Sequence, residues 1–114
     1  MILIVDDNSE MRQMIRSVIE DLDSEFCEGT DGSEALALYQ KYHPDWVLMD
    51  LAMREMDGLT ATRQIIAAFP EAKIAIVSSF DDAGLRSAAS AAGANKYFIK
   101  ENLFELRGLF AKTL

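Results

Sequence analysis

The chain has 114 residues, of which 50% are hydrophobic and 26% charged, and its formal net charge at pH 7 is −8. This length suits one domain with its own core, and no apolar run approaches the ~20 residues needed to cross a bilayer. The acidity argues against direct binding to nucleic acid. From the length and the apolar runs we expect one domain over 1–114 and no membrane partner, with any effector domain outside this chain. The opening MILIVDD lacks the basic region and cleavage site of a signal peptide, which by default favours a cytoplasmic location.

Short apolar runs alternate with segments of helical period along the whole chain. The runs are 2–5, 25–27, 46–49, 73–77 and 96–99. The first helix carries an apolar stripe from Met11 through Met14 to Leu22, with Asn8 or Ser9 as its cap. Further helices are expected at about 33–42, 59–69, 82–92 and 103–111. The alternation predicts an α/β fold, a parallel sheet covered by helices on both faces.

The helix expected at 82–92 differs from the others because alanines form most of its inner face. Leu85 is its only large apolar residue. Burying alanine removes little apolar area, so we expect this helix to be the least firmly docked and a candidate moving part.

Three single residues have ordinary structural interpretations. The lone Cys27 is expected to be a small core residue, because no Cys or His cluster surrounds it. His43 lies in the polar KYHP turn and should be solvated, and Trp46 should contribute to the core.

Polar residues follow four of the five runs. They are Asp6 and Asp7, Asp50, Ser78 and Lys100. Right-handed crossovers make the strands parallel, so their carboxyl ends share the edge where open α/β sheets bind ligands. Each residue alone is more often a helix cap or a solvated turn residue, but together they predict a site.

Three carboxylates at one point repel each other, and Lys100 supplies only one positive charge. Mg²⁺ prefers oxygen ligands, takes one or two carboxylates and leaves room for a phosphate oxygen. The cluster therefore indicates a magnesium site with space for a phosphoryl group. The alternative is an acidic rim that binds cations loosely, and the absence of a glycine-rich phosphate loop argues against a nucleotide.

The motifs VDD, MDLAM..MDG, IVSS and KYFIK follow one another in an order and spacing that resemble the bacterial response regulator receiver domain over essentially the whole chain. The resemblance implies a flavodoxin-like (βα)5 three-layer sandwich with strand order 2-1-3-4-5. It also implies that Asp50 is the nucleophile phosphorylated by a sensor histidine kinase or a phosphotransfer protein. Such a domain is a signalling switch rather than an enzyme, although it catalyses phosphoryl transfer onto its own Asp50 and the hydrolysis that follows.

The same resemblance implies the metal ligands. Asp7 and Asp50 would bind Mg²⁺ directly, Asp6 would act largely through a water, and the backbone carbonyl of Ala52 would complete the protein ligands. Lys100 and the metal would neutralise charge on the transferring phosphoryl group.

Two further residues are implied to carry the signal. Ser78 would donate its hydroxyl to the phosphoryl group, and Tyr97 corresponds to the family's switch aromatic. The alternative for Tyr97 is a half-buried strand residue with its hydroxyl in water. The surface of the fourth helix, fifth strand and fifth helix would then change, and family members commonly form homodimers or bind partners there. The stretch SSFDD (78–82) resembles receivers attached to helix-turn-helix domains, which suggests transcription regulation, with a stand-alone receiver still open.

This sequence departs from the family pattern at two prolines. Arg54 follows Met53, which should loosen that loop, and Glu101 follows Lys100, where we expect a trans peptide. The rim positions Ala52 and Phe80 are both apolar, which predicts a long-lived phosphorylated state.

Two other functions stay open at this point. One is a degenerate pseudo-receiver, acting as an interaction or dimerisation module without phosphorylation. The other is a small phosphatase with an aspartyl-phosphate intermediate, although Ala52 stands where that class usually places a second acid.

Overall fold

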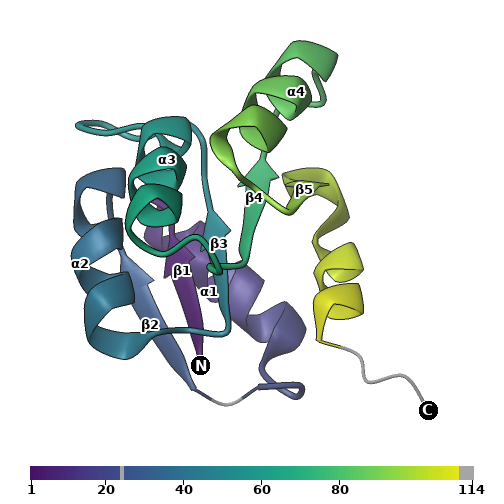
Figure 1. The fold of residues 1–114 in the computed structure, drawn as a ribbon. Coiled ribbons are helices and arrows are strands. Elements are labelled where there is room, and N and C mark those ends of the chain that lie inside the picture. Colours follow the sequence, from purple (N-terminus) through teal and green to yellow (C-terminus); the bar gives the residue numbers. More distant parts are fainter. Residues whose placement is uncertain (24, 111–114) are drawn as a thin grey trace.

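The computed structural model describes residues 1–23 and 25–110 and has one five-stranded parallel sheet of order β2-β1-β3-β4-β5 (Figure 1). This confirms the predicted fold and strand order. In chain order the elements are β1 Ile2–Val5, α1 Ser9–Ile19, β2 Phe26–Gly29, α2 Gly32–Tyr42, β3 Trp46–Met49, α3 Gly58–Ala68, β4 Ile74–Ser78, α4 Ala83–Ala92, β5 Lys96–Ile99 and a 3₁₀ helix, η1, Lys100–Leu109.

The sheet separates two hydrophobic cores. Because successive strand residues point to opposite faces, Ile2 and Ile4 of β1 pack with α1 and η1, whereas Leu3 and Val5 pack with α2 and α3. All four are fully buried. Figure 1 shows α2 and α3 in front of the sheet and α1 behind it. This central burial makes β1 and its neighbour β3 a rigid base for the residues that follow them.

Strand bounds follow the predicted runs with small differences. Three strands have the predicted bounds, whereas β2 begins one residue later and extends to Gly29. β4 includes Ser78, which was expected to follow the strand and instead pairs with Ile99 of β5.

Helix α1 is capped by Asn8, as predicted: its side chain accepts the Met11 amide at 3.0 Å. The prediction of a long apolar stripe was wrong at two positions, Met14 and Leu22. Met14 is 52% exposed because Ile15 and Ile19 form the buried line of the helix, and Leu22 lies beyond the helix end and is 37% exposed.

The C-terminal helix was also predicted incorrectly. An α-helix was expected over 103–111, but the chain enters the 3₁₀ helix η1 directly at Lys100, with non-helical backbone at Asn102. Residue 111 lies outside the described residues. In α4, Ala89 and Ala92 are buried, Leu85 is half-buried and Ala91 is exposed, so its inner face is shallow, as expected. Its weak docking stays a prediction.

The single residues mostly behave as expected. Cys27 is half-buried against the α2 and α3 core, and burial raises the pKa of its thiol. His43 is exposed and ends α2 with a φ of 45°, where its ring lies edge-on to Tyr39 and Phe69. Trp46 is half-buried against the α1 and η1 core. None of the helices in 1–23 and 25–110 has the length and apolar character that a membrane span requires.

Candidate functional site

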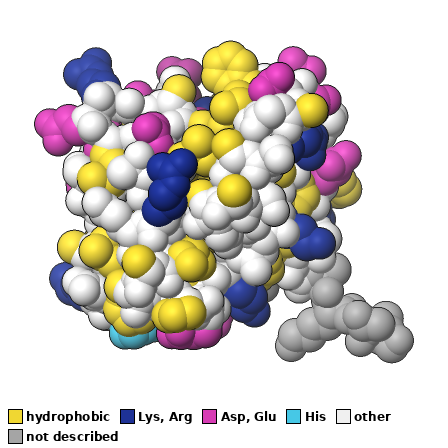
Figure 2. All heavy atoms as spheres, turned by 45° about the horizontal axis from the view of Figure 1, so that its top comes forward, with side chains coloured by type: hydrophobic (Ala, Val, Ile, Leu, Met, Phe, Trp, Pro, Cys, Tyr) yellow, Lys and Arg dark blue, Asp and Glu magenta, His cyan; other side chains and the backbone are white. Residues whose placement is uncertain are grey.

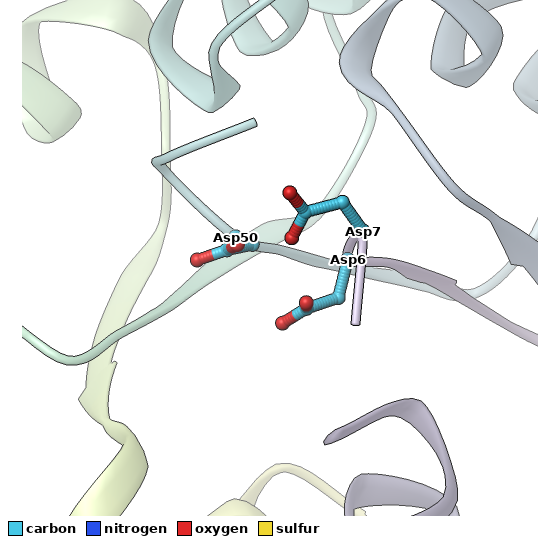
Figure 3. A group of neighbouring side chains, drawn as sticks. All are labelled: Asp6, Asp7 and Asp50. Carbon is cyan, nitrogen blue, oxygen red and sulfur yellow. The ribbon is translucent and has the colours of Figure 1, made fainter. Parts of the chain in front are cut away.

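Three carboxylates converge where β1 and β3 end. These strands pair in parallel, with Val5 opposite Met49, so Asp6 and Asp50 follow at the same level. Asp6 is 1% exposed and Asp50 is 6% exposed, whereas Asp7 is exposed. Ligand oxygens of the three lie within 4.8 Å of one another. Figure 3 shows them close together, with Asp6 and Asp7 projecting from the end of β1 and Asp50 from the end of β3. This is the acidic cluster that the sequence predicted.

Lys100 reaches the cluster from the end of β5. Its Nζ lies 2.9 Å from Asp6 Oδ2 and 3.1 Å from Asp50 Oδ1. Burial, together with the charge of Asp6, raises the pKa of Asp50, while Lys100 opposes that shift. Burial also opposes the charge on Lys100, but its ion pairs with Asp6 and Asp50 raise the pKa of the ammonium. One cation thus partly compensates two buried acids.

The donor set suits a hard divalent cation. Asp6 Oδ1 accepts the Asn8 amide at 2.9 Å, and Asp50 Oδ1 accepts the Leu51 amide at 2.9 Å. Within the described residues, Asp6 Oδ2 is buried and receives no hydrogen bond of ordinary geometry, although the Lys100 ammonium lies beside it. A buried carboxylate oxygen without its hydrogen bonds, close to two further carboxylates, fits the oxygen ligation that Mg²⁺ prefers.

Ser78 and Tyr97, the two residues expected to carry the signal, both form hydrogen bonds with the backbone of Phe80. Ser78 is 1% exposed, and its Oγ accepts the Phe80 amide at 3.0 Å. The Tyr97 hydroxyl donates to the Phe80 carbonyl at 2.7 Å, and the Arg86 guanidinium lies 4.7 Å from the centre of the Tyr97 ring. The Tyr97 hydroxyl therefore has a backbone partner as well as access to solvent. Displacement of the loop after β4 would break both hydrogen bonds.

The rim of the site is apolar on one side and charged on the other. The apolar side is a shallow pocket of about 220 Å³, lined by Leu51, Ala52, Asp57, Leu59, Phe80 and Leu85. Arg54 lines a larger hollow of about 580 Å³ on the Asp7 side. Figure 2, which brings this end of the molecule forward, shows hydrophobic side chains gathered in its upper part with acidic side chains around them. No cis peptide occurs in the described chain, which agrees with the trans bond expected before Glu101.

Arg12 is a residue near the site that sequence reasoning missed. Its Nη1 donates to the Asp6 backbone carbonyl at 2.7 Å, and its Nε donates to Glu28 at 2.8 Å. Arg12 therefore fixes the turn that carries Asp6 and Asp7. The sequence feature that could have indicated this role is an arginine in the first helix after Asp6 and Asp7, together with the acidic Glu28 in the neighbouring strand β2.

Asp31 was missed as well. It caps α2 and also contacts the loop after β3. The cap was readable as a D-x-x-E pattern, Asp31 to Glu34, but the contact to the loop was not.

Comparison with known proteins agrees with this geometry. Residues 2–110 match the family model described as response regulator receiver domain. The chain is 34% identical over 103 residues to the transcriptional regulatory protein DegU of Brevibacillus brevis, covering 88% of this chain and 43% of that protein. It is 40% identical over 100 residues to the chemotaxis protein CheY of Listeria monocytogenes, covering 87% and 84%. The crystal structure of a LuxR-family two-component response regulator from Aurantimonas sp. SI85-9A1 matches with a TM-score of 0.86 and 32% identity, covering 94% of this chain and 79% of that chain.

Proposed function

The chain belongs to the response regulator receiver domain family of two-component signalling, and on this premise we propose that Asp50 accepts a phosphoryl group from a histidine kinase or phosphotransfer protein. The observation that carries the proposal is the pairing of Asp50 with Lys100, beside two further carboxylates whose oxygens lie within 4.8 Å. A purely structural acid at a strand end would not need this arrangement.

The chemistry is a displacement at phosphorus. Asp50 Oδ1 is held by Lys100 and by the Leu51 amide, so we assign the attack to Oδ2. An oxygen–phosphorus bond forms, and the bond to the leaving group breaks with its electron pair going to that group. Mg²⁺, held by Asp7, Asp50, the Ala52 carbonyl and, through water, Asp6, would supply positive charge to the phosphoryl oxygens. Lys100, whose Nζ lies 3.1 Å from Asp50 Oδ1, supplies a second positive charge.

The phosphoryl group carries about −1.5 to −2 charges at neutral pH, while Asp50 loses the charge of its carboxylate, so the site gains up to about one negative charge and three acceptor oxygens. Ser78 Oγ accepts the Phe80 amide, so its own hydroxyl hydrogen is free to donate to the phosphoryl oxygens, and a shift of Ser78 toward them would pull on the Phe80 backbone. If the Phe80 backbone moves with Ser78, its carbonyl releases the Tyr97 hydroxyl, and the change reaches the α4, β5 and η1 surface. We propose that this surface controls the output by binding a second copy of the chain or another partner. We propose transcription regulation as that output, as the name of the DegU relative suggests.

Intact-protein mass spectrometry tests the proposal directly. Incubation with Mg²⁺ and acetyl phosphate is expected to add the mass of one phosphoryl group, and Asp50→Asn should take up none, because an amide is a far weaker nucleophile than a carboxylate. Asp57→Asn is the matched control, since Asp57 caps α3 in the same loop and should leave the uptake intact. No uptake by the wild type would favour the pseudo-receiver, and uptake that persists in Asp50→Asn would contradict the assignment of Asp50.

A second prediction concerns loss of the phosphoryl group. Ala52 and Phe80 line the same apolar pocket, and Phe80 is 54% exposed, so neither positions an attacking water. Phe80→Glu should therefore raise the rate of dephosphorylation at least about tenfold. This is less than the roughly 10²–10⁴-fold rate increase that a well-placed general base contributes. The decay of the phosphorylated mass after removal of the donor measures the rate. Phe104→Glu, at the other strongly exposed phenylalanine, is the control, and equal rates in wild type and Phe80→Glu would refute the idea.

A further inference from the structure

The Asp31 carboxylate joins the start of α2 to a loop that is far away in the sequence. Its Oδ2 accepts the Ser33 amide at 2.9 Å and the Met56 amide at 3.1 Å, and its Oδ1 accepts the Glu55 amide at 3.0 Å. Ser33 belongs to α2, whereas Glu55 and Met56 belong to the loop between β3 and α3. One side chain thus caps a helix and holds a neighbouring loop.

The platform that presents Asp31 is itself rigid. Glu34 Oε1 accepts the Thr30 and Asp31 amides at 2.6 and 3.2 Å, which completes a capping box. The residue after Asp31 is Gly32, and a Cβ there would lie 2.5 Å from the Met56 carbonyl oxygen. Only glycine lets the start of α2 approach the loop this closely. The amides around Asp31 lower the pKa of its carboxyl, in keeping with their orientation toward it.

The held loop runs from Asp50 to Gly58 and includes Ala52 and Arg54. At its base the Gly58 amide donates to the Leu51 carbonyl at 2.9 Å. The two amides bound by Asp31 come directly after Arg54, the position at which the sequence lacks a stiffening proline. The loop is therefore fixed at its base and again beyond Arg54, and Ala52 lies between these two points.

We propose that Asp31 is a positioning residue for the metal site: by holding the loop through Glu55 and Met56, it presents the Ala52 carbonyl to Mg²⁺ and so sets the affinity for the ion. This rests on the proposed function, in which Ala52 is a ligand. Residues that hold ligands in place typically change metal affinity 10–100-fold when they are lost.

The substitution Asp31→Ser separates the two roles of the side chain. Serine caps helices about as well as aspartate, but its single, shorter hydroxyl cannot hold Ser33 and also reach Glu55 and Met56. We expect Mg²⁺ to bind Asp31→Ser about tenfold more weakly in titration calorimetry. Hydrogen exchange by NMR, in the absence of Mg²⁺, should show faster exchange at the Glu55 and Met56 amides. Asp31→Asn keeps one carboxamide oxygen and should restore part of the affinity.

Asp82→Ser is the matched control because Asp82 caps α4 by accepting the Leu85 amide and, among residues 1–23 and 25–110, its side chain accepts no hydrogen bond from a second loop. It should leave Mg²⁺ affinity unchanged. Equal Mg²⁺ affinity in wild type and Asp31→Ser would overturn the proposal, as would an equal loss in Asp82→Ser. If the wild type binds Mg²⁺ and takes up the phosphoryl group while Asp31→Ser is unchanged, only the role of Asp31 fails. If the wild type neither binds Mg²⁺ nor takes up the phosphoryl group, the proposed function itself is wrong.

Discussion

Replacing Lys100 with methionine is expected to lower the free energy of unfolding by about 3–5 kcal/mol at pH 7 in magnesium-free buffer. The side chains of Asp6 and Asp50 are 1% and 7% exposed, and the Lys100 ammonium lies 2.9 and 3.1 Å from them. Methionine keeps much of the length and apolar character of the lysine stem but removes the charge. Two buried carboxylates then face each other without a cation.

The loss should depend on pH with a definite sign. Burial and the charge of Asp6 already raise the pKa of Asp50 above its ordinary value of 3.8, and removing Lys100 raises it further. The folded state then holds this proton more tightly than the unfolded state, so stability is lost as pH rises from 3.8 through the folded pKa. Lowering the pH from 7 to about 5 should therefore reduce the difference between wild type and Lys100→Met.

Mg²⁺ should stabilise Lys100→Met more than it stabilises the wild type, because the ion supplies the missing charge and no ammonium competes with it. Urea unfolding with and without Mg²⁺ measures both quantities. Lys96→Met is the control, since Lys96 is exposed on β5, and a change within about 0.5 kcal/mol is expected there. Equal stability of Lys100→Met and wild type at pH 7, or an equal gain from Mg²⁺, would show that Lys100 does not compensate the acids.

The central strands β1, β3 and β4 were predictable because they are almost fully buried. ILIV and WVLM are continuous apolar segments, each followed by an aspartate, which is typical of buried parallel strands. The C-terminal helix was not predictable in the same way. Leu103, Leu106 and Leu109 recur every three residues, which suits the three-residue turn of a 3₁₀ helix, whereas Leu103, Leu106 and Phe110 suit an α-helix equally well. Leu109 and Phe110 are both partly buried against the same core, so the spacing of the apolar residues did not distinguish the two kinds of helix.

The acidic cluster was predictable for a different reason. Parallel strands deliver the residues that follow them to one edge, so Asp6, Asp50 and Lys100 were expected at the same edge once the strand order was known. The supports of the site were not predictable. Asp31 meets Glu55 and Met56 across 24 and 25 residues of chain, and no local pattern encodes those hydrogen bonds. Sequence reasoning thus predicted the carboxylates and the lysine that meet at this edge, whereas the structure was needed to find the residues that hold them.

Gly58→Ala is expected to destabilise the fold by about 3 kcal/mol or more, at the upper end for overpacked positions. A Cβ at this position would meet the Asp50 carbonyl oxygen, and it would lie 2.9 Å from the Asp50 carbonyl carbon and 3.1 Å from Leu51 Cα. These are backbone atoms, so no change of rotamer relieves the contact. The requirement for glycine is therefore steric, because Gly58 has ordinary helical backbone, unlike Gly93 with its φ of 109°.

The same change should damage the site, which distinguishes it from ordinary loss of stability. To make room for a methyl group, the Asp50 backbone must move away from α3, and this disturbs the contact of Asp50 with Lys100 and stretches the hydrogen bond from the Gly58 amide to Leu51. Phosphoryl uptake should then fall even at temperatures where Gly58→Ala remains folded by circular dichroism. Gly108→Ala is the control: a Cβ there meets nothing within 4 Å, so the variant should match the wild type or gain up to about 1 kcal/mol. A folded Gly58→Ala with wild-type stability and uptake would mean that the Asp50 backbone tolerates displacement, and the proposal that the rigid end of β3 holds Asp50 for phosphoryl uptake would then be wrong.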